Sequence, residues 1–311
     1  MQHYFLGEEI KNPWMNASGV WCTSHEELLE LCSTPIGAIV TKSVTLEARK
    51  GNPEPRFWGN ATSSINSMGL PNHGIQYYID FANNYQKEIG DKKFILSLAG
   101  LHLEKHMDSI CNIINDCENI DAVELNLSCP NIPTHPLIAY NLPVFERTLR
   151  AFLEKCDKPV GVKLSPYFEA HQFEEVANML NTTRIVFITT INSLPNGLLI
   201  DVENETPLIV PKNGVGGVGG MYAKPTTLAN IYQFYPLLKK EIAIIGCGGI
   251  LTGTDALEHT LCGASLLQVG TALAMHGISI FETLQNELDS VLTKKNDKNL
   301  TNYIGRLKKL V

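Results

Sequence analysis

Cys129 is the residue of this sequence whose surroundings best suit acid–base chemistry. It lies between Ser128 and Pro130, directly after an apolar run of strand length, and Asn126 and Asn131 flank it. A thiol with a reference pKa of about 8.5 is only partly ionised at neutral pH, so a nearby cation or a closed site would have to assist proton abstraction. The other seven cysteines form no C-x-x-C pair, and we expect them to be small buried hydrophobes.

Lys42 and Lys163 are the candidate cationic groups. Lysine is rarely buried without an anionic partner or a chemical task, and both residues fall at or near the ends of predicted strands. We expect them to project from neighbouring strands into one pocket. Lys42 could contact a substrate carboxylate, and Lys163 could either form a Schiff base or hold positive charge beside a ring that becomes anionic.

Four asparagines add carboxamide groups to the candidate residues: Asn66, Asn126, Asn131 and Asn192. A carboxamide carries both donors and an acceptor, which suits the alternating N–H and C=O edge of a cyclic imide or pyrimidine. Asx turns are the alternative interpretation for any one of them.

Glycines gather late in the chain, at 246–249 and at Gly270. Glycine loops that lead into helices expose backbone N–H groups suited to a phosphate, and barrel folds often bind phosphate after strands seven and eight. Tight turns explain each glycine equally well when it is considered alone. Together, the two loops predict a phosphate site.

Eight apolar runs must position these residues. They span residues 14–17, 37–41, 94–98, 122–126, 160–164, 185–190, 242–246 and 265–269. Amphipathic stretches alternate with them, which is the pattern of βα units around a parallel sheet. Eight units favour a closed barrel over a doubly wound sheet, because the latter usually stops at about six strands and carries its glycine fingerprint in the first turn. We predict an α/β fold, a single-domain (β/α)8 TIM barrel over residues 1–311.

The amphipathic stretches predict helices, the first of them with Ser24 as N-cap and Glu27 three residues later. The predicted helices span residues 24–32, 75–89, 103–117, 143–156, 169–180, 226–239, 281–292 and 300–310. Residues 44–74 and 192–222 are too long for ordinary βα loops, so we expect them to be lids or binding loops at the C-terminal face of the strands.

The composition excludes several classes of protein. The 311 residues are 44% hydrophobic and 18% charged, with a formal net charge of −7, which excludes a disordered chain and a basic nucleic-acid binder. The N-terminus lacks a signal peptide, and no apolar run reaches the roughly 18 residues that a membrane span needs. We expect a cytoplasmic protein with no membrane or nucleic-acid partner and no metal site.

In its ordered motifs the chain resembles the dihydroorotate dehydrogenases, and within them the soluble class 1A form. The motifs are NPWMNASG at 12–19, TKS at 41–43, NSMGLPN at 66–72, NLSCPN at 126–131, GVKL at 161–164, INS at 191–193, GCGGI at 246–250 and QVGTAL at 268–273. The cysteine in NLSCPN is especially specific, because membrane-associated class 2 relatives have serine there.

The resemblance implies an FMN enzyme that oxidises (S)-dihydroorotate to orotate in pyrimidine biosynthesis and passes the electrons to fumarate, which becomes succinate. It implies that Cys129 takes the C5 proton while the C6 hydride goes to flavin N5, and that Lys163 stabilises the negative charge of the reduced flavin. It also implies a homodimer and a mobile lid over residues 130–139.

The same resemblance assigns the remaining site residues. The substrate contacts are Lys42, Asn66, Met68, Gly69, Leu70, Asn126, Asn131, Asn192 and Ser193. The FMN contacts are Ala17, Ser18, Gly19, Lys42, Ser43, Asn126, Lys163, Ile191, Gly220, Cys247, Gly248, Gly249, Gly270 and Thr271.

Three alternatives stay open from the sequence. A class 1B catalytic subunit has the same barrel and cysteine but passes electrons to NAD through an iron–sulfur partner. A Schiff-base lyase would use Lys42 or Lys163. A flavin- or phosphate-binding barrel without catalytic activity would serve as a partner protein.

Overall fold

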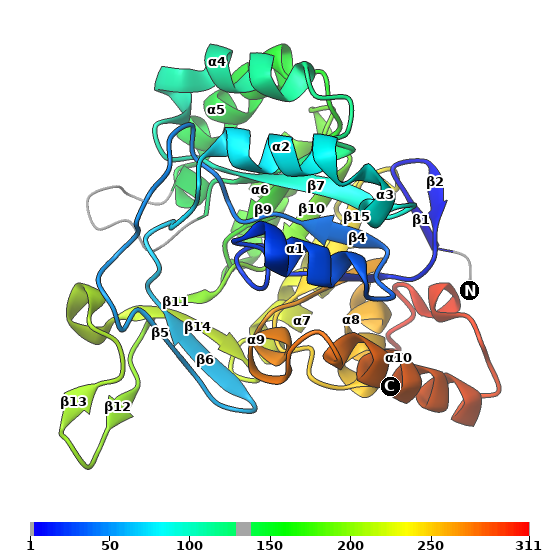
Figure 1. The fold of residues 1–311 in the computed structure, drawn as a ribbon. Coiled ribbons are helices and arrows are strands. Elements are labelled where there is room, and N and C mark those ends of the chain that lie inside the picture. Colours follow the sequence, from blue (N-terminus) through cyan, green and yellow to red (C-terminus); the bar gives the residue numbers. More distant parts are fainter. Residues whose placement is uncertain (1–2, 129–137, 311) are drawn as a thin grey trace.

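Eight parallel strands form a closed barrel at the centre of the protein (Figure 1). The structure is a computed structural model that describes residues 3–128 and 138–310. Each predicted strand run overlaps one barrel strand, and the predicted (β/α)8 barrel is confirmed. In their order around the barrel the strands are β10 (Phe187–Thr190), β15 (Ala243–Cys247), β16 (Leu266–Val269), β3 (Trp14–Asn16), β4 (Ala38–Val40), β7 (Lys93–Ala99), β8 (Ala122–Asn126) and β9 (Val160–Leu164).

Helices surround the barrel on its outer side (Figure 1). They are α1 (His25–Cys32), α2 (Ile75–Asn84), α3 (Gln86–Ile89), α4 (Leu103–Asn115), α5 (Leu142–Lys155), α6 (Ala170–Asn181), α7 (Lys224–Phe234), α8 (Gly253–Cys262), α9 (Thr271–His276) and α10 (Ile280–Lys294), with short 3-10 turns at Ile138–Tyr140, Pro211–Gly214 and Leu300–Tyr303. The predicted capping box of α1 is present, with the Ser24 side chain accepting from the Glu27 N–H. No helix within the described ranges is long and apolar enough to cross a membrane.

The barrel interior is filled in layers because alternate residues of each strand point inward. At one end the layer is apolar and includes Met15, Val40, Ile95 and Phe187. Two residues further along the strands the inward positions become polar, and this change brings polar side chains to the C-terminal ends of the strands.

A hairpin that the sequence analysis did not predict closes the apolar end of the barrel. It is made of β1 (His3–Phe5) and β2 (Glu8–Ile10), and it lies away from the small sheet described next (Figure 1). The Phe5 ring packs edge-on against Phe187, with ring centroids 5.4 Å apart. The hairpin therefore completes the apolar layer.

The two long inserts are not irregular loops. They pair with each other in a four-stranded antiparallel sheet of β5 (Phe57–Gly59), β6 (Ser63–Asn66), β14 (Gly216–Gly220) and β11 (Leu194–Gly197), and a hairpin of β12 (Ile200–Asp201) and β13 (Thr206–Pro207) extends from it. The pairing of β6 with β14 joins segments about 150 residues apart, a register that strand patterns within one insert cannot reveal.

The predicted helix over residues 300–310 is wrong beyond its first turn. Gly305 adopts a φ of +70°, and a Cβ at this position would lie 2.1 Å from the ring of Tyr235. The backbone therefore leaves the helical conformation where it crosses Tyr235, and Leu307 N–H donates to the Leu261 carbonyl instead.

Two other predicted helices are shorter than expected. The stretch at 75–89 breaks at Tyr85, whose φ of −119° and ψ of 33° separate α2 from α3. Helix α7 ends at Phe234 and not at residue 239, because Pro236 lacks an N–H group and its ring clashes with the preceding helical turn.

Candidate active site

A pocket of about 440 Å³ opens at the C-terminal ends of the barrel strands, bordered by the small antiparallel sheet. It brings together most of the site residues predicted from the sequence. These are Ala17, Ser18, Gly19, Lys42, Ser43, Asn66, Met68, Leu70, Asn126, Lys163, Ile191, Asn192, Ser193, Gly220, Cys247, Gly248, Gly249, Gly270 and Thr271.

Among the described residues, one predicted site residue, Gly69, does not line the pocket. Gly69 has a φ of +72°, and a Cβ on it would lie 2.3 Å from the side-chain oxygen of Asn52, so this residue packs against Asn52. Cys129 and Asn131 lie outside the described residues, as does most of the predicted lid at 130–139.

Lys163 is 5% exposed and points inward from β9. Its Nζ donates to Gln268 Oε1 at 2.6 Å and lies 3.4 Å from Cys247 Sγ. Burial by itself lowers the pKa of Lys163, but the nearby Cys247 and Glu124 side chains oppose this effect, and the net pKa is raised. Lys163 is therefore an ammonium group near neutral pH.

Cys247 on β15 places its thiol next to that ammonium. Burial raises the pKa of Cys247 despite the opposing influence of Lys163. The thiol is therefore protonated near pH 7, and at that pH it contributes a weak dipole to the pocket and no charge.

Lys42 reaches the same pocket from the far side of the barrel. It follows β4, which is separated from β9 by β7 and β8, so the expectation that the two lysines come from neighbouring strands is wrong. Its Nζ donates to the Gly19 carbonyl at 3.3 Å. Gly19 has a φ of +97°, a conformation that favours glycine, and a Cβ there would lie 3.1 Å from Nζ and crowd the ammonium.

A row of hydrogen bonds orders the polar wall between the lysines. Ser43 Oγ lies 3.1 Å from Ser18 Oγ and accepts from Asn126 Nδ2 at 3.0 Å. Asn192 Nδ2 in turn donates to Asn126 Oδ1 at 3.2 Å. These bonds fix the carboxamides, and Ser128, which donates to the Lys163 carbonyl at 2.8 Å, anchors the end of the β8 segment to β9.

The small sheet supplies the opposite wall. Asn66 Nδ2 donates to the Gly217 carbonyl at 3.2 Å, and Ser64 Oγ lies 2.8 Å from Thr271 Oγ1 at the start of α9. A Cβ on Gly219 would lie 2.9 Å from that serine oxygen, so the sheet approaches α9 closely at this point. The inserts thus contribute ordered strands to the pocket.

In the glycine loop after β15 the backbone adopts conformations that any residue with a Cβ would strain. Gly248 and Gly249 have φ values of +134° and +77°, and a Cβ on Gly249 would lie 2.3 Å from Lys224 Cβ. Glycine loops of this kind offer backbone N–H groups to anions. The loop and the start of α9 at Thr271 both line the pocket.

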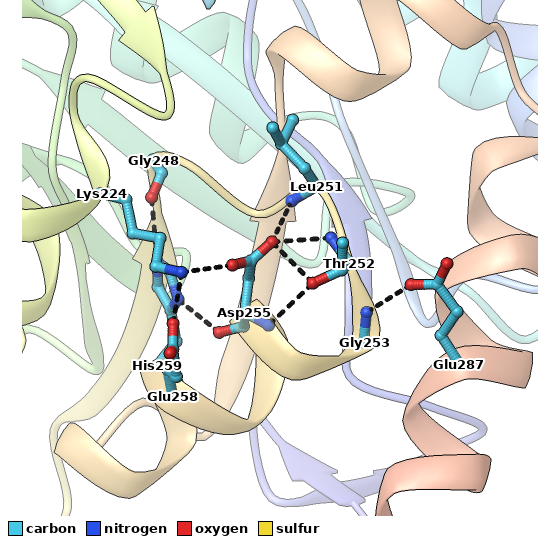
Figure 2. A network of polar contacts seen from close by, with 9 residues as sticks. All are labelled: Lys224, Gly248, Leu251, Thr252, Gly253, Asp255, Glu258, His259 and Glu287. Carbon is cyan, nitrogen blue, oxygen red and sulfur yellow. Dashed lines mark hydrogen bonds and ion pairs between the residues drawn. The ribbon is translucent and has the colours of Figure 1, made fainter. Parts of the chain in front are cut away.

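Helix α8 holds this loop from behind (Figure 2). Asp255 accepts from the N–H groups of Leu251 and Thr252 at 2.9 and 2.8 Å, and its other oxygen pairs with Lys224 at 2.5 Å. Burial alone would raise the pKa of Asp255, but the bonds from Lys224, Leu251 and Thr252 prevail and hold it below its usual range.

His259 forms the second connection between α8 and the loop (Figure 2). Its Nε2 lies 3.0 Å from the Gly248 carbonyl and its Nδ1 lies 2.7 Å from the Asp255 carbonyl. Burial lowers the pKa of His259, so the neutral ring prevails and one of its two nitrogens donates at a time.

The sequence analysis missed two groups of site residues. One group lines the pocket: Val20, Trp21, Phe57, Ser64, Gly219, Ala223, Ile250, Leu251 and Ala274. The other, Glu124, Thr189 and Gln268, lies in the barrel interior beneath Lys163. The two-residue period of the strands carries the signal for Glu124 and Gln268, since each lies two residues after an inward apolar residue, Ala122 and Leu266.

The chain was compared with known proteins. The family model described as dihydroorotate dehydrogenase matches residues 1–292. A dihydroorotate dehydrogenase (fumarate) of Saccharomyces cerevisiae is 46% identical over 304 residues, which cover 97% of this chain and 96% of the relative. The dihydroorotate dehydrogenase A (fumarate) of Lactococcus lactis subsp. lactis is 46% identical over 307 residues, 98% of each chain. This chain therefore belongs to the dihydroorotate dehydrogenase family.

Proposed function

We propose that this chain oxidises dihydroorotate to orotate with FMN as its resident cofactor and fumarate as the electron acceptor. The observation that carries the proposal is the near full-length similarity to relatives whose names specify both dihydroorotate and fumarate. The pocket supports it, because lysines, carboxamides and glycine loops meet there in one cavity.

The residues of the pocket fit FMN. The glycine loop at 248–249 and the start of α9 suit a phosphate, and the cavity of about 440 Å³ is of the size that small-molecule sites have. Every residue that the sequence analysis assigned to FMN lines the cavity. Lys163 supplies a fixed positive charge, which suits a ring that gains negative charge on reduction.

In the proposed reaction one proton and one hydride leave dihydroorotate, and a C5–C6 double bond forms. When bound, FMN would supply the two-electron chemistry that links removal of the C6 hydride to reduction of fumarate. Cys129 takes the proton from C5 as general base. Fumarate gains two electrons and two protons and leaves as succinate.

The other residues bind and orient the substrate in this proposal. Lys42 pairs with the substrate carboxylate, and the carboxamides of Asn66, Asn126 and Asn192 contact its ring edge. The hydrogen bonds from Asn126 to Ser43 and from Asn192 to Asn126 preorganise two of these groups before substrate arrives. Asn131, Ser193, Met68 and Leu70 complete the proposed set, and Gly69 supports it through its turn against Asn52.

An anaerobic experiment tests the function and the acceptor together. Purified protein is mixed with dihydroorotate and the flavin absorbance is followed, after which fumarate, NAD or a quinone is added to separate samples. We expect bleaching by dihydroorotate and recovery with fumarate alone. Recovery that requires NAD and a second subunit would establish the class 1B alternative, and trapping of a lysine by borohydride would indicate a Schiff-base enzyme.

We further propose that the chain works as a single-domain homodimer in the cytoplasm. Support for this assignment comes from its resemblance to class 1A enzymes. Sedimentation of the purified protein near twice the monomer mass would support the dimer, and a monomer active at the same concentration would contradict it.

A further inference from the structure

A chain of buried polar side chains crosses the barrel interior beneath the pocket. Gln268 on β16 accepts from Lys163 Nζ through Oε1 at 2.6 Å and donates through Nε2 to Glu124 Oε2 at 2.7 Å. Glu124 lies on β8, which is not a neighbour of β16 in the sheet, so this second bond spans the barrel. Glu124 and Gln268 are both 0% exposed.

The orientation of the Gln268 carboxamide is fixed by the two charged groups that it joins. Its oxygen faces the Lys163 ammonium and its NH2 group faces the Glu124 carboxylate. In the reversed orientation an N–H group would face an ammonium and an oxygen would face a carboxylate, and both contacts would be repulsive. The amide dipole therefore transmits the attraction between Lys163 and Glu124.

Glu124 is a carboxylate whose burial needs an explanation. Oε2 accepts a second bond, from Thr189 Oγ1 at 2.7 Å, whereas Oε1 is buried with no hydrogen-bond partner among the described residues. An isolated buried charge is costly, so a carboxylate here requires a nearby cation, and Lys163 is the cation to which it is linked.

We propose that Glu124 is a positioning residue for Lys163 that acts through Gln268, fixing the ammonium in the pocket and keeping it charged. The inference rests on the proposed function in one respect, because it assumes that Lys163 takes part in the proposed reaction. Glu124 itself is not among the residues that line the pocket, and in the proposed mechanism it does not contact the substrate.

Amine acetylation of the purified protein tests the proposal without turnover. Glu124→Gln keeps the shape of the side chain and removes its charge, so the pKa of the buried Lys163 should fall and its neutral, reactive fraction should rise, about tenfold for each unit. Lys42 lines the same pocket and is the internal control. We expect the ratio of Lys163 to Lys42 acetylation, measured by mass spectrometry after a short acetic anhydride pulse, to rise about tenfold or more.

Glu124→Asp is the matched variant, because it changes the length of the side chain and keeps its charge. We expect its acetylation ratio to stay within about twofold of the parent. An unchanged ratio in Glu124→Gln, or a parallel rise of Lys42 and Lys163 that indicates a loosened pocket, would overturn the proposal.

A second variant keeps the test decisive if Glu124→Gln does not fold. Gln268→Met removes the bridge and leaves both charges, and the proposal requires the Lys163 to Lys42 ratio to rise there too; an unchanged ratio contradicts it. Where Glu124→Gln folds and carries its flavin, its midpoint potential should become more positive at a pH that keeps Lys163 protonated, because a nearby negative charge is lost, whereas that of Glu124→Asp should not. Equal shifts in both variants would show a purely structural role.

Discussion

At the scale of single residues, the pocket concentrates positive charge in an acidic protein. The chain has a net charge of −7, yet Lys42 and Lys163 both lie 5% exposed in one cavity. Each is held by oxygen acceptors, a backbone carbonyl for Lys42 and a carboxamide for Lys163. An anionic substrate and a phosphate-bearing cofactor would therefore meet a local field opposite in sign to that of the whole molecule.

The proposed base is tested by Cys129→Ala. We expect turnover of dihydroorotate to fall by about 10²- to 10⁴-fold, because a positioned general base contributes on that order, while the flavin absorbance of the purified protein stays at the parent level. Cys117→Ala removes a buried thiol outside the pocket and is the control, with parent turnover expected. Loss of flavin from Cys129→Ala would assign that residue a structural role.

His3 makes the stability of the fold depend on pH. It is 1% exposed, neither ring nitrogen has a hydrogen-bond partner among the described residues, and burial lowers its pKa to about 4. The unfolded chain therefore binds more protons than the folded one between about pH 6.5 and pH 4, and stability is lost as the pH falls through this range. Over that pH range the unfolding free energy of His3→Leu, measured with urea, should fall by roughly 1 to 3 kcal/mol less than that of the parent protein.

At the scale of elements, the loop after β15 depends on both its backbone and the helix behind it. The positive φ values of Gly248 and Gly249 let the chain turn tightly, and Asp255 and His259 of α8 hold the turn in place (Figure 2). A rigid loop presents its N–H groups without further loss of conformational entropy when an anion binds.

Gly249→Ala tests this element. The new Cβ would be strained at a φ of +77° and would lie 2.3 Å from Lys224 Cβ, so we expect a loss of roughly 1 to 3 kcal/mol in unfolding free energy and reduced flavin content after purification. Gly7→Ala is the matched control, because Gly7 has a similar φ of +81° and open space around it, outside the pocket. That variant should lose about 1 kcal/mol and keep its flavin. Equal flavin content in the two variants would contradict the role of the loop.

At the scale of the whole molecule, ligand binding should stabilise the barrel, because the pocket gathers residues from segments between Ala17 and Ala274. A ligand that binds only the folded state adds about 2.7 kcal/mol at a concentration one hundred times its Kd. The proposed FMN site therefore has a thermodynamic signature that is independent of catalysis.

Thermal unfolding of flavin-depleted protein tests this signature. We expect Tm to rise with added FMN, and to rise less with riboflavin at equal concentration, because riboflavin lacks the phosphate that the two loops would bind. Equal shifts for the two flavins would contradict the phosphate assignment to 248–249 and 270–271.

The barrel and most of its pocket follow from local sequence patterns. Runs such as 185–190 and 242–246 are rich in apolar and β-branched residues, and the strand runs alternate with helical stretches along the chain. Parallel strands bring their C-terminal ends to one face of the barrel. Residues that directly follow those runs, such as Lys42 and Gly270, therefore lie at the same face of the barrel. The sequence alone shows which residues follow each strand, so it also shows which side chains gather there.

Only the tertiary structure decided the contacts between segments far apart in the chain. The pairing of the two inserts, the course of the C-terminal tail over Tyr235, and the bond from Gln268 to Glu124 across 144 residues each depend on which surfaces the closed barrel brings together. Local patterns specify which way a side chain points from its own strand. They do not specify which side chain it meets on the other side of the barrel, because that depends on how the strands tilt and stagger when the sheet closes.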